Sequence, residues 1–167
     1  MITLREYTEA DISLMVAYLN NRNVTRYLTA NIPQPYTEEN AVWWIGEGSK
    51  VGFVQAIDYN GVFVGTVGAS RGLFEHSKTA QIGYWLGEPF WGRGIATAAL
   101  VQHSTAIFQQ TDIVRLHAQV FAGNNASMRV LEKGGYQCEG ILEKAAFKHG
   151  AHIDIHVYAA INPHTLQ

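Results

Sequence analysis

The sequence predicts a single α+β domain in which helices pack on one central, mostly antiparallel sheet. Its 167 residues, 47% of them hydrophobic, suffice for one complete core. Three β-rich runs follow one another between residues 51 and 86, as in an antiparallel meander. From residue 94 onward, helical and strand patterns alternate. Taken along residues 1–167, these patterns predict a sheet of six to seven strands flanked by about four helices.

Each element of the first half follows from a local signal. Thr8 to Asp11 resembles a capping box ahead of apolar residues at helical spacing, so a helix is expected from Ile12. Thr37, followed by two glutamates, is expected to start a second helix. Asn60-Gly61 is the pair favoured by a type I′ hairpin turn. The predicted order is a strand at 2–5, the two helices, and strands at 51–58, 62–70 and 79–86.

The second half changes from a meander to alternating helices and strands. A long helix with apolar periodicity is expected from Gly94 to about Gln109, and a shorter helix is expected to stop at Gly134-Gly135. The last strand places Ile153 and Ile155 on one face and polar side chains on the other. The predicted order is a helix at 94–109, a strand at 114–121, a helix at 126–133, and strands at 136–142 and 152–161.

Composition excludes several classes of function. Twelve basic against fourteen acidic residues leave a formal charge of −2, which argues against nucleic acid as a partner. No apolar run reaches the length of a membrane span, so no membrane association is expected. Cys138 has no cysteine to pair with, so we expect a cytoplasmic protein and a core or half-buried Cys138. His152 and His156 would lie about 13 Å apart along a strand, so no metal site is expected.

The most informative stretch runs from Trp91 to Thr97, between a β-rich run and the long helix. Gly92 and Gly94 let the main chain turn with exposed N–H groups, and the helix points the positive end of its macrodipole at the same place. Such a place binds phosphate. A P-loop is excluded because Gly94-Ile95-Ala96 lacks the lysine and the hydroxyl that a P-loop needs. A dinucleotide-binding fingerprint is disfavoured because it would follow the first strand of a βαβ unit, whereas this turn follows several strands. A plain strand-to-helix connection stays open as the alternative.

Three motifs, in this order and spacing, resemble the acetyl-CoA motifs of the GNAT N-acetyltransferase superfamily. They are Tyr84-Trp85-Leu86, Phe90 to Thr97, and Asn124 to Ser127 continued by Val130 to Tyr136. Further segments are similar to the branch that contains the RimJ and RimL ribosomal-protein N-terminal acetyltransferases. These segments are Pro33 to Thr37, Ala41 with Trp44-Ile45, and Asp154 with Tyr158-Ala159.

The resemblance implies a GNAT-like fold with a sheet that splays between the strand ending at Leu86 and the strand beginning near Arg115. Acetyl-CoA would lie in this gap, with its pantetheine amides against the main chain and its pyrophosphate against the N–H groups of the turn. Trp91 departs from the glutamine or arginine usual in the family and is alternatively a core anchor. The implied cofactor-binding residues are Tyr84, Trp85, Leu86, Trp91, Gly92, Arg93, Gly94, Ile95, Ala96, Thr97, Asn124 and Ser127.

The resemblance also implies which groups catalyse the reaction of an acetyl-CoA-dependent N-acetyltransferase. A main-chain N–H near Leu86 would polarise the thioester oxygen. Ser127 would protonate the departing thiolate, because Leu131 holds the position of the tyrosine that many members use. The alternatives are that the Ser127 hydroxyl serves only the helix backbone, and that Asn124 is only a helix cap.

The acceptor is expected to be a primary amine, most readily a protein or peptide N-terminal α-amine. Gln81 replaces the glutamate of lysine-directed relatives, so a strong base is missing and the less basic α-amine is easier to use. Tyr36, Trp43 and Gln81 are expected to line the acceptor cleft. Alternatives are a small-molecule amine such as a polyamine, antibiotic or metabolite, and a non-catalytic CoA-binding sensor. The sequence leaves a homodimer open.

Overall fold

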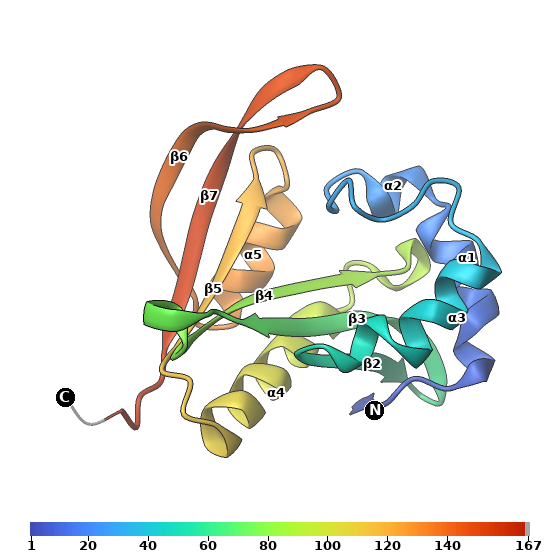
Figure 1. The fold of residues 1–167 in the computed structure, drawn as a ribbon, viewed down its shortest axis with the longest axis horizontal. Coiled ribbons are helices and arrows are strands. Elements are labelled where there is room, and N and C mark those ends of the chain that lie inside the picture. Colours follow the sequence, from blue (N-terminus) through green and yellow to red (C-terminus); the bar gives the residue numbers. More distant parts are fainter. Residues whose placement is uncertain (166–167) are drawn as a thin grey trace.

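The computed structural model describes residues 1–165 and builds them around a seven-stranded sheet in the order β1-β2-β3-β4-β5-β7-β6 (Figure 1). The strands are β1 (Ile2–Arg5), β2 (Phe53–Tyr59), β3 (Val62–Arg71), β4 (Thr79–Leu86), β5 (Arg115–Phe121), β6 (Gln137–Lys148) and β7 (Ala151–Ile161). The α-helices are α1 (Ile12–Leu19), α2 (Arg22–Thr25), α3 (Glu38–Gly46), α4 (Ile95–Gln110) and α5 (Asn125–Lys133). Short 3-10 turns are η1 (Glu9–Asp11), η2 (Gly48–Lys50), η3 (Phe74–His76) and η4 (Glu88–Phe90). The predicted mixed fold is confirmed.

The sheet is antiparallel except where β4 meets β5. These two strands are parallel and pair at three positions only, from Thr79 opposite Arg115 to Gln81 opposite His117. Beyond that point β4 and β5 diverge, as Figure 1 shows for the two arrows. The remaining residues of β4 still pair with β3, as far as Leu86 opposite Gly65. The predicted splay in the middle of the sheet is therefore present.

Helices cover both faces of the sheet. Successive residues of a strand point to opposite faces, and Ala56 packs in a cluster with Met15 of α1 and Ala41 of α3. The next residue, Ile57, packs in the cluster that holds Ile95 of α4. The α4 helix also joins α5 in a third cluster over β4 and β5. As a result, α4 and α5 lie on one face, and α1 and α3 cover the first half of the other.

Local signals place most elements where the sequence predicts them. The capping box at Thr8 is present, and Thr37 caps α3 through the backbone N–H of Asn40. In the turn between β2 and β3, Asn60 and Gly61 have φ angles of 54° and 84°, the left-handed backbone that a type I′ turn requires.

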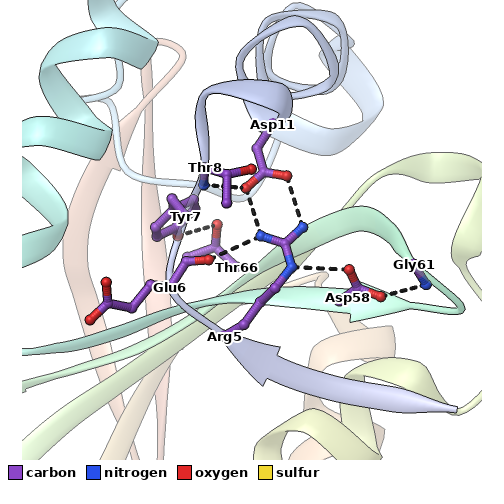
Figure 2. A network of polar contacts seen from close by, with 8 residues as sticks. All are labelled: Arg5, Glu6, Tyr7, Thr8, Asp11, Asp58, Gly61 and Thr66. Atoms are coloured by element: carbon purple, nitrogen blue, oxygen red, sulfur yellow. Dashed lines mark hydrogen bonds and ion pairs between the residues drawn. The ribbon is translucent and has the colours of Figure 1, made fainter.

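The Arg5 guanidinium ties the first strand to the first helix and to the β2–β3 turn (Figure 2). Its two terminal nitrogens donate to both carboxylate oxygens of Asp11 at 2.8 Å, and its Nε donates to Asp58 at 3.0 Å. Burial opposes ionisation of Asp11, but the hydrogen bonds from Arg5 and from the Thr8 backbone N–H outweigh it, and the pKa of this carboxyl is lowered. Asp58 in turn accepts from the Gly61 N–H. One side chain thus joins three segments at the N-terminal edge of the sheet.

Three features differ from the sequence-based expectation. The β6 strand runs to Lys148 instead of ending at 142, because it continues to pair with β7 after a register shift between Leu142 and Ala146. Cys138 on this strand is exposed, so the prediction of a core or half-buried cysteine is wrong. The four-residue α2 was not predicted, because it has no apolar period. The side chain of Asn21 caps this helix.

No helix in residues 1–165 combines the length and apolarity needed to cross a bilayer.

Candidate active site

The turn before α4 has the backbone that the sequence suggests. Gly92 and Gly94 have φ angles of 71° and 74°, in the left-handed region that other residues rarely adopt. A Cβ built at either position would meet no atom within 4 Å. These glycines are therefore required by the path of the chain and not by crowding, and the space beside them is open.

The beginning of α4 is free to bind an anion. Gly94 is the N-cap residue of this 16-residue helix, and no side chain in residues 1–165 caps its first turn. The N–H groups of Ile95, Ala96 and Thr97 have no intrahelical acceptor, because the first turn of a helix always lacks them. No acidic residue lies in this turn to satisfy the helix macrodipole. The geometry suits a phosphate group.

This helix end opens into a cavity of about 490 Å³ that is lined by the end of β4, the turn before α4, the α2 region and α5. Its charged side chains are all basic, namely Arg26, Arg93, Arg129 and Lys133, and the described residues that line it include no carboxylate and no imidazole. The lining brings together every cofactor-binding residue that the sequence predicts. These are Tyr84, Trp85, Leu86, the run from Trp91 to Thr97, Asn124 and Ser127.

Trp91 connects the turn to the end of β4. Its indole Nε1 donates to the carbonyl oxygen of Leu86 at 2.9 Å, while the residue remains 46% exposed. Trp91 is therefore no core anchor, and this alternative is ruled out. The Arg93 guanidinium lies 5.6 Å from the centre of the Phe90 ring, which holds a positive charge at the cavity wall.

On the opposite side of the cavity, the first turn of α5 carries two polar side chains. Asn124 caps the helix, because its Oδ1 accepts the Ser127 backbone N–H at 3.3 Å. The Ser127 hydroxyl is thus not needed as a cap, and its Oγ lies 2.8 Å from the Tyr84 hydroxyl on β4. Leu131, one turn further on, is completely buried in the core.

A wall of the cavity comes from α2 and the residues after it, which sequence reasoning missed. Asn23, Val24, Arg26, Tyr27 and Leu28 all line the cavity. The side-chain amides of Asn21 and Asn23 donate to the two carboxylate oxygens of Glu88 at 2.5 and 3.0 Å, which fixes α2 beside the end of β4.

A second tether to the same wall comes from β6, the edge strand opposite to β1. The Lys148 ammonium at the end of β6 donates to the carbonyl oxygens of Arg26, at 3.0 Å, and of Leu28. Its ammonium also lies 5.2 Å from the centre of the Phe121 ring on β5. Only the Asn21 cap signal marks this region in the sequence, and a tether from residue 148 has no local signature.

Three residues expected at the acceptor cleft lie outside this cavity. Tyr36 is buried under α1, where its hydroxyl contacts the Met15 sulfur at 3.5 Å. Trp43 lies 56% exposed on α3, in a surface hollow with Glu38, Glu39 and Glu47. Gln81 is exposed at the closed end of the splay, opposite His117. Among residues 1–165, no three His, Cys, Asp or Glu side chains gather in a way that would hold a metal ion.

Comparison with known proteins identifies the family. The family model described as an acetyltransferase (GNAT) domain matches residues 1–137. The chain belongs to the GNAT acetyltransferase family. The activity is acetyl-CoA-dependent N-acetyl transfer.

The relatives include uncharacterized N-acetyltransferases and a ribosomal-protein acetyltransferase. The chain is 28% identical to the uncharacterized N-acetyltransferase YoaA of Bacillus subtilis, over 97% of this chain and 94% of that protein. It is 35% identical to the ribosomal-protein-serine acetyltransferase of Escherichia coli, over 51% of this chain and 48% of that protein. The fold is similar to Mycobacterium smegmatis RimJ in complex with CoA-disulfide, with a TM-score of 0.86 and 22% identity over 99% of this chain and 84% of that one.

The cavity fits a coenzyme that carries several phosphate charges. An uncapped N-terminus of a long helix, two left-handed glycines and four basic side chains all favour an anion, and no carboxylate opposes it among the described lining residues. A GNAT enzyme needs no metal for the transfer, because the thioester supplies the activated acetyl group.

Proposed function

We propose that this GNAT enzyme acetylates the N-terminal α-amine of a protein or peptide. The observation that carries the proposal is the charge of the cavity lining. It contains four basic side chains and, within residues 1–165, neither a carboxylate nor an imidazole that could take a proton from an ammonium group. An amine must therefore arrive largely neutral.

This requirement separates the two common kinds of protein amine. An α-amine with a pKa near 8 is about one tenth neutral at pH 7, whereas a lysine amine near 10.4 is neutral in about one molecule in 2,500. The difference favours the α-amine by roughly 250-fold in available nucleophile, about 3 kcal/mol. The similarity to a ribosomal-protein-serine acetyltransferase supports a protein acceptor.

The site residues take the following roles in this proposal. The N–H groups from Gly92 to Thr97 hold the pyrophosphate, and the main chain near Trp85 and Leu86 holds the pantetheine arm. A main-chain N–H near Leu86 polarises the thioester oxygen. Ser127 gives its proton to the departing sulfur, because its hydroxyl lies at the cavity wall and is not needed as a helix cap.

A matched pair of peptides tests the acceptor. One peptide carries a free N-terminus and no lysine, and the other has the same sequence with an acetylated N-terminus and one lysine. With acetyl-CoA, release of free thiol should be about a hundredfold faster with the first peptide at pH 7. Comparable rates on both peptides would contradict the proposal, and turnover confined to a polyamine or an aminoglycoside would replace it with a small-molecule acceptor.

A further inference from the structure

The Tyr84 hydroxyl contacts the Ser127 residue at two atoms. The distance is 2.8 Å to the side-chain Oγ and 3.1 Å to the backbone carbonyl oxygen. Tyr84 comes from β4 and Ser127 from the first turn of α5, so this contact joins two of the elements that line the cavity. It is a direct side-chain link between the strand that runs along the pantetheine site and the residue proposed as proton donor.

The hydrogens of the two hydroxyl groups can be counted. Each group has one O–H, and a phenol is a stronger acid, and so a better donor, than an aliphatic alcohol. Both acceptors within reach of the Tyr84 O–H belong to Ser127, namely Oγ at 2.8 Å and the backbone carbonyl oxygen at 3.1 Å. The phenol has one hydrogen for these two acceptors, and Oγ is the nearer of the two. When the phenol donates to Oγ, the hydrogen of Ser127 itself is free to point into the cavity. Within residues 1–165, the Ser127 hydroxyl has one hydrogen-bond partner, the Tyr84 hydroxyl.

We propose that Tyr84 is a positioning residue that donates a hydrogen bond to Ser127 Oγ and thereby directs the Ser127 proton at the departing sulfur. The inference rests on the proposed function, in which Ser127 is the proton donor. A hydrogen bond received at Oγ also makes the O–H of Ser127 more acidic, because hydrogen bonds in a chain polarise one another.

The transfer balances with these groups alone. The amine nitrogen forms its bond to the acetyl carbon, and the carbon–sulfur bond breaks with its electron pair on sulfur. The Ser127 proton moves to the sulfur, and the oxygen left behind keeps the hydrogen bond from Tyr84. The proton that leaves the amine nitrogen returns to Ser127 Oγ through water, so no further reactant is consumed.

The surroundings of Tyr84 suit a fixed donor. Its ring packs against two core clusters, one containing Leu100 of α4 and the other Ile95, which restricts its movement. Burial raises the pKa of Tyr84 well above its usual value, so the phenol keeps its hydrogen at every pH at which the amine is used.

Residue Tyr136 provides a matched control. Its hydroxyl lies 2.8 Å from Ser104 Oγ, the same kind of pair at the same distance, but buried in the core and outside the cavity lining. Tyr84→Phe and Tyr136→Phe each remove one such hydrogen bond, so both should lower the melting temperature to a similar extent. Only Tyr84→Phe should change the rate of transfer.

The test is a double-mutant cycle with the free-N-terminus peptide. We expect Ser127→Ala to lower kcat about a hundredfold and Tyr84→Phe about tenfold, each with an unchanged KM for acetyl-CoA. In the Ser127→Ala background, Tyr84→Phe should cause no further loss, because it acts through the missing hydroxyl. Tyr136→Phe should keep the native kcat.

The outcomes separate the inference from the proposed function. A native kcat in Tyr84→Phe, or an equal tenfold loss with and without Ser127, would overturn the positioning role while native turnover keeps the proposed function. A native enzyme without turnover on a free N-terminus would overturn the proposed function and the inference with it. A loss of kcat in Tyr136→Phe equal to that in Tyr84→Phe would assign the effect to stability and overturn the inference alone.

Discussion

Replacing His103 by glutamine should remove a specific part of the acid sensitivity of this fold. His103 lies on α4, the helix whose first turn we propose to bind the pyrophosphate, and is 2% exposed. Its Nδ1 is 3.0 Å from Gln55 Oε1, and within residues 1–165 its Nε2 has no hydrogen-bond partner. Protonation would therefore bury a charge and an N–H without an acceptor. Burial accordingly lowers the pKa of His103 from 6.5 to about 4.

The direction and the magnitude of the change in the free energy of unfolding with pH follow from this pKa. Between pH 6.5 and about 4, the unfolded chain holds a proton on His103 that the folded chain does not, so the free energy of unfolding falls as the pH falls through this window. The full shift corresponds to about 3 kcal/mol. Of this, about 2 kcal/mol is lost by pH 5 relative to pH 8.

Urea unfolding at pH 8 and pH 5 measures the effect. Glutamine at position 103 does not titrate and can still donate a hydrogen bond to Gln55, so His103→Gln should lose about 2 kcal/mol less than the native protein between the two pH values. His164→Gln, at an exposed histidine, should behave like the native protein. Equal losses in the native protein and in His103→Gln would refute the argument.

Three further substitutions probe the site and the fold. Gly94→Asp puts a carboxylate at the uncapped helix N-terminus and should weaken acetyl-CoA binding at least tenfold by calorimetry, whereas Gly150→Asp, at a glycine with a similar φ of 76°, should not. Trp91→Phe removes the hydrogen bond to the end of β4 and should raise the KM for acetyl-CoA about fivefold, while Trp43→Phe leaves it unchanged. Arg5→Lys cannot reproduce the two-pronged contact of the guanidinium and should lower the free energy of unfolding by about 2 kcal/mol in urea at pH 7. Native CoA affinity in folded Gly94→Asp, a native KM in Trp91→Phe, or native stability in Arg5→Lys would each contradict its prediction.

Much of the fold could be predicted from local sequence signals. The capping residue Thr37, the turn at Asn60-Gly61 and the glycines before α4 each act on the backbone within a few residues, so their effect is visible in the sequence. The β6 strand escaped prediction beyond residue 142, and α2 escaped entirely, because neither has an apolar period. The position of Cys138 on an exposed edge strand depends on which strands pair, which its neighbours in sequence do not specify.

By itself the sequence determined the order of the strands and of the other helices, the glycine turn before α4 and the resemblance to the GNAT family, since these depend on short-range backbone preferences and on residue spacing. Only the tertiary structure decided that Tyr36 and Trp43 lie away from the cavity, that α2 forms one of its walls, and that the Tyr84 hydroxyl reaches Ser127. These facts arise from contacts between residues far apart in the sequence, such as Lys148 with Arg26, which are separated by 122 positions. Such contacts exist only once the sheet has brought distant segments together, so no local pattern encodes them.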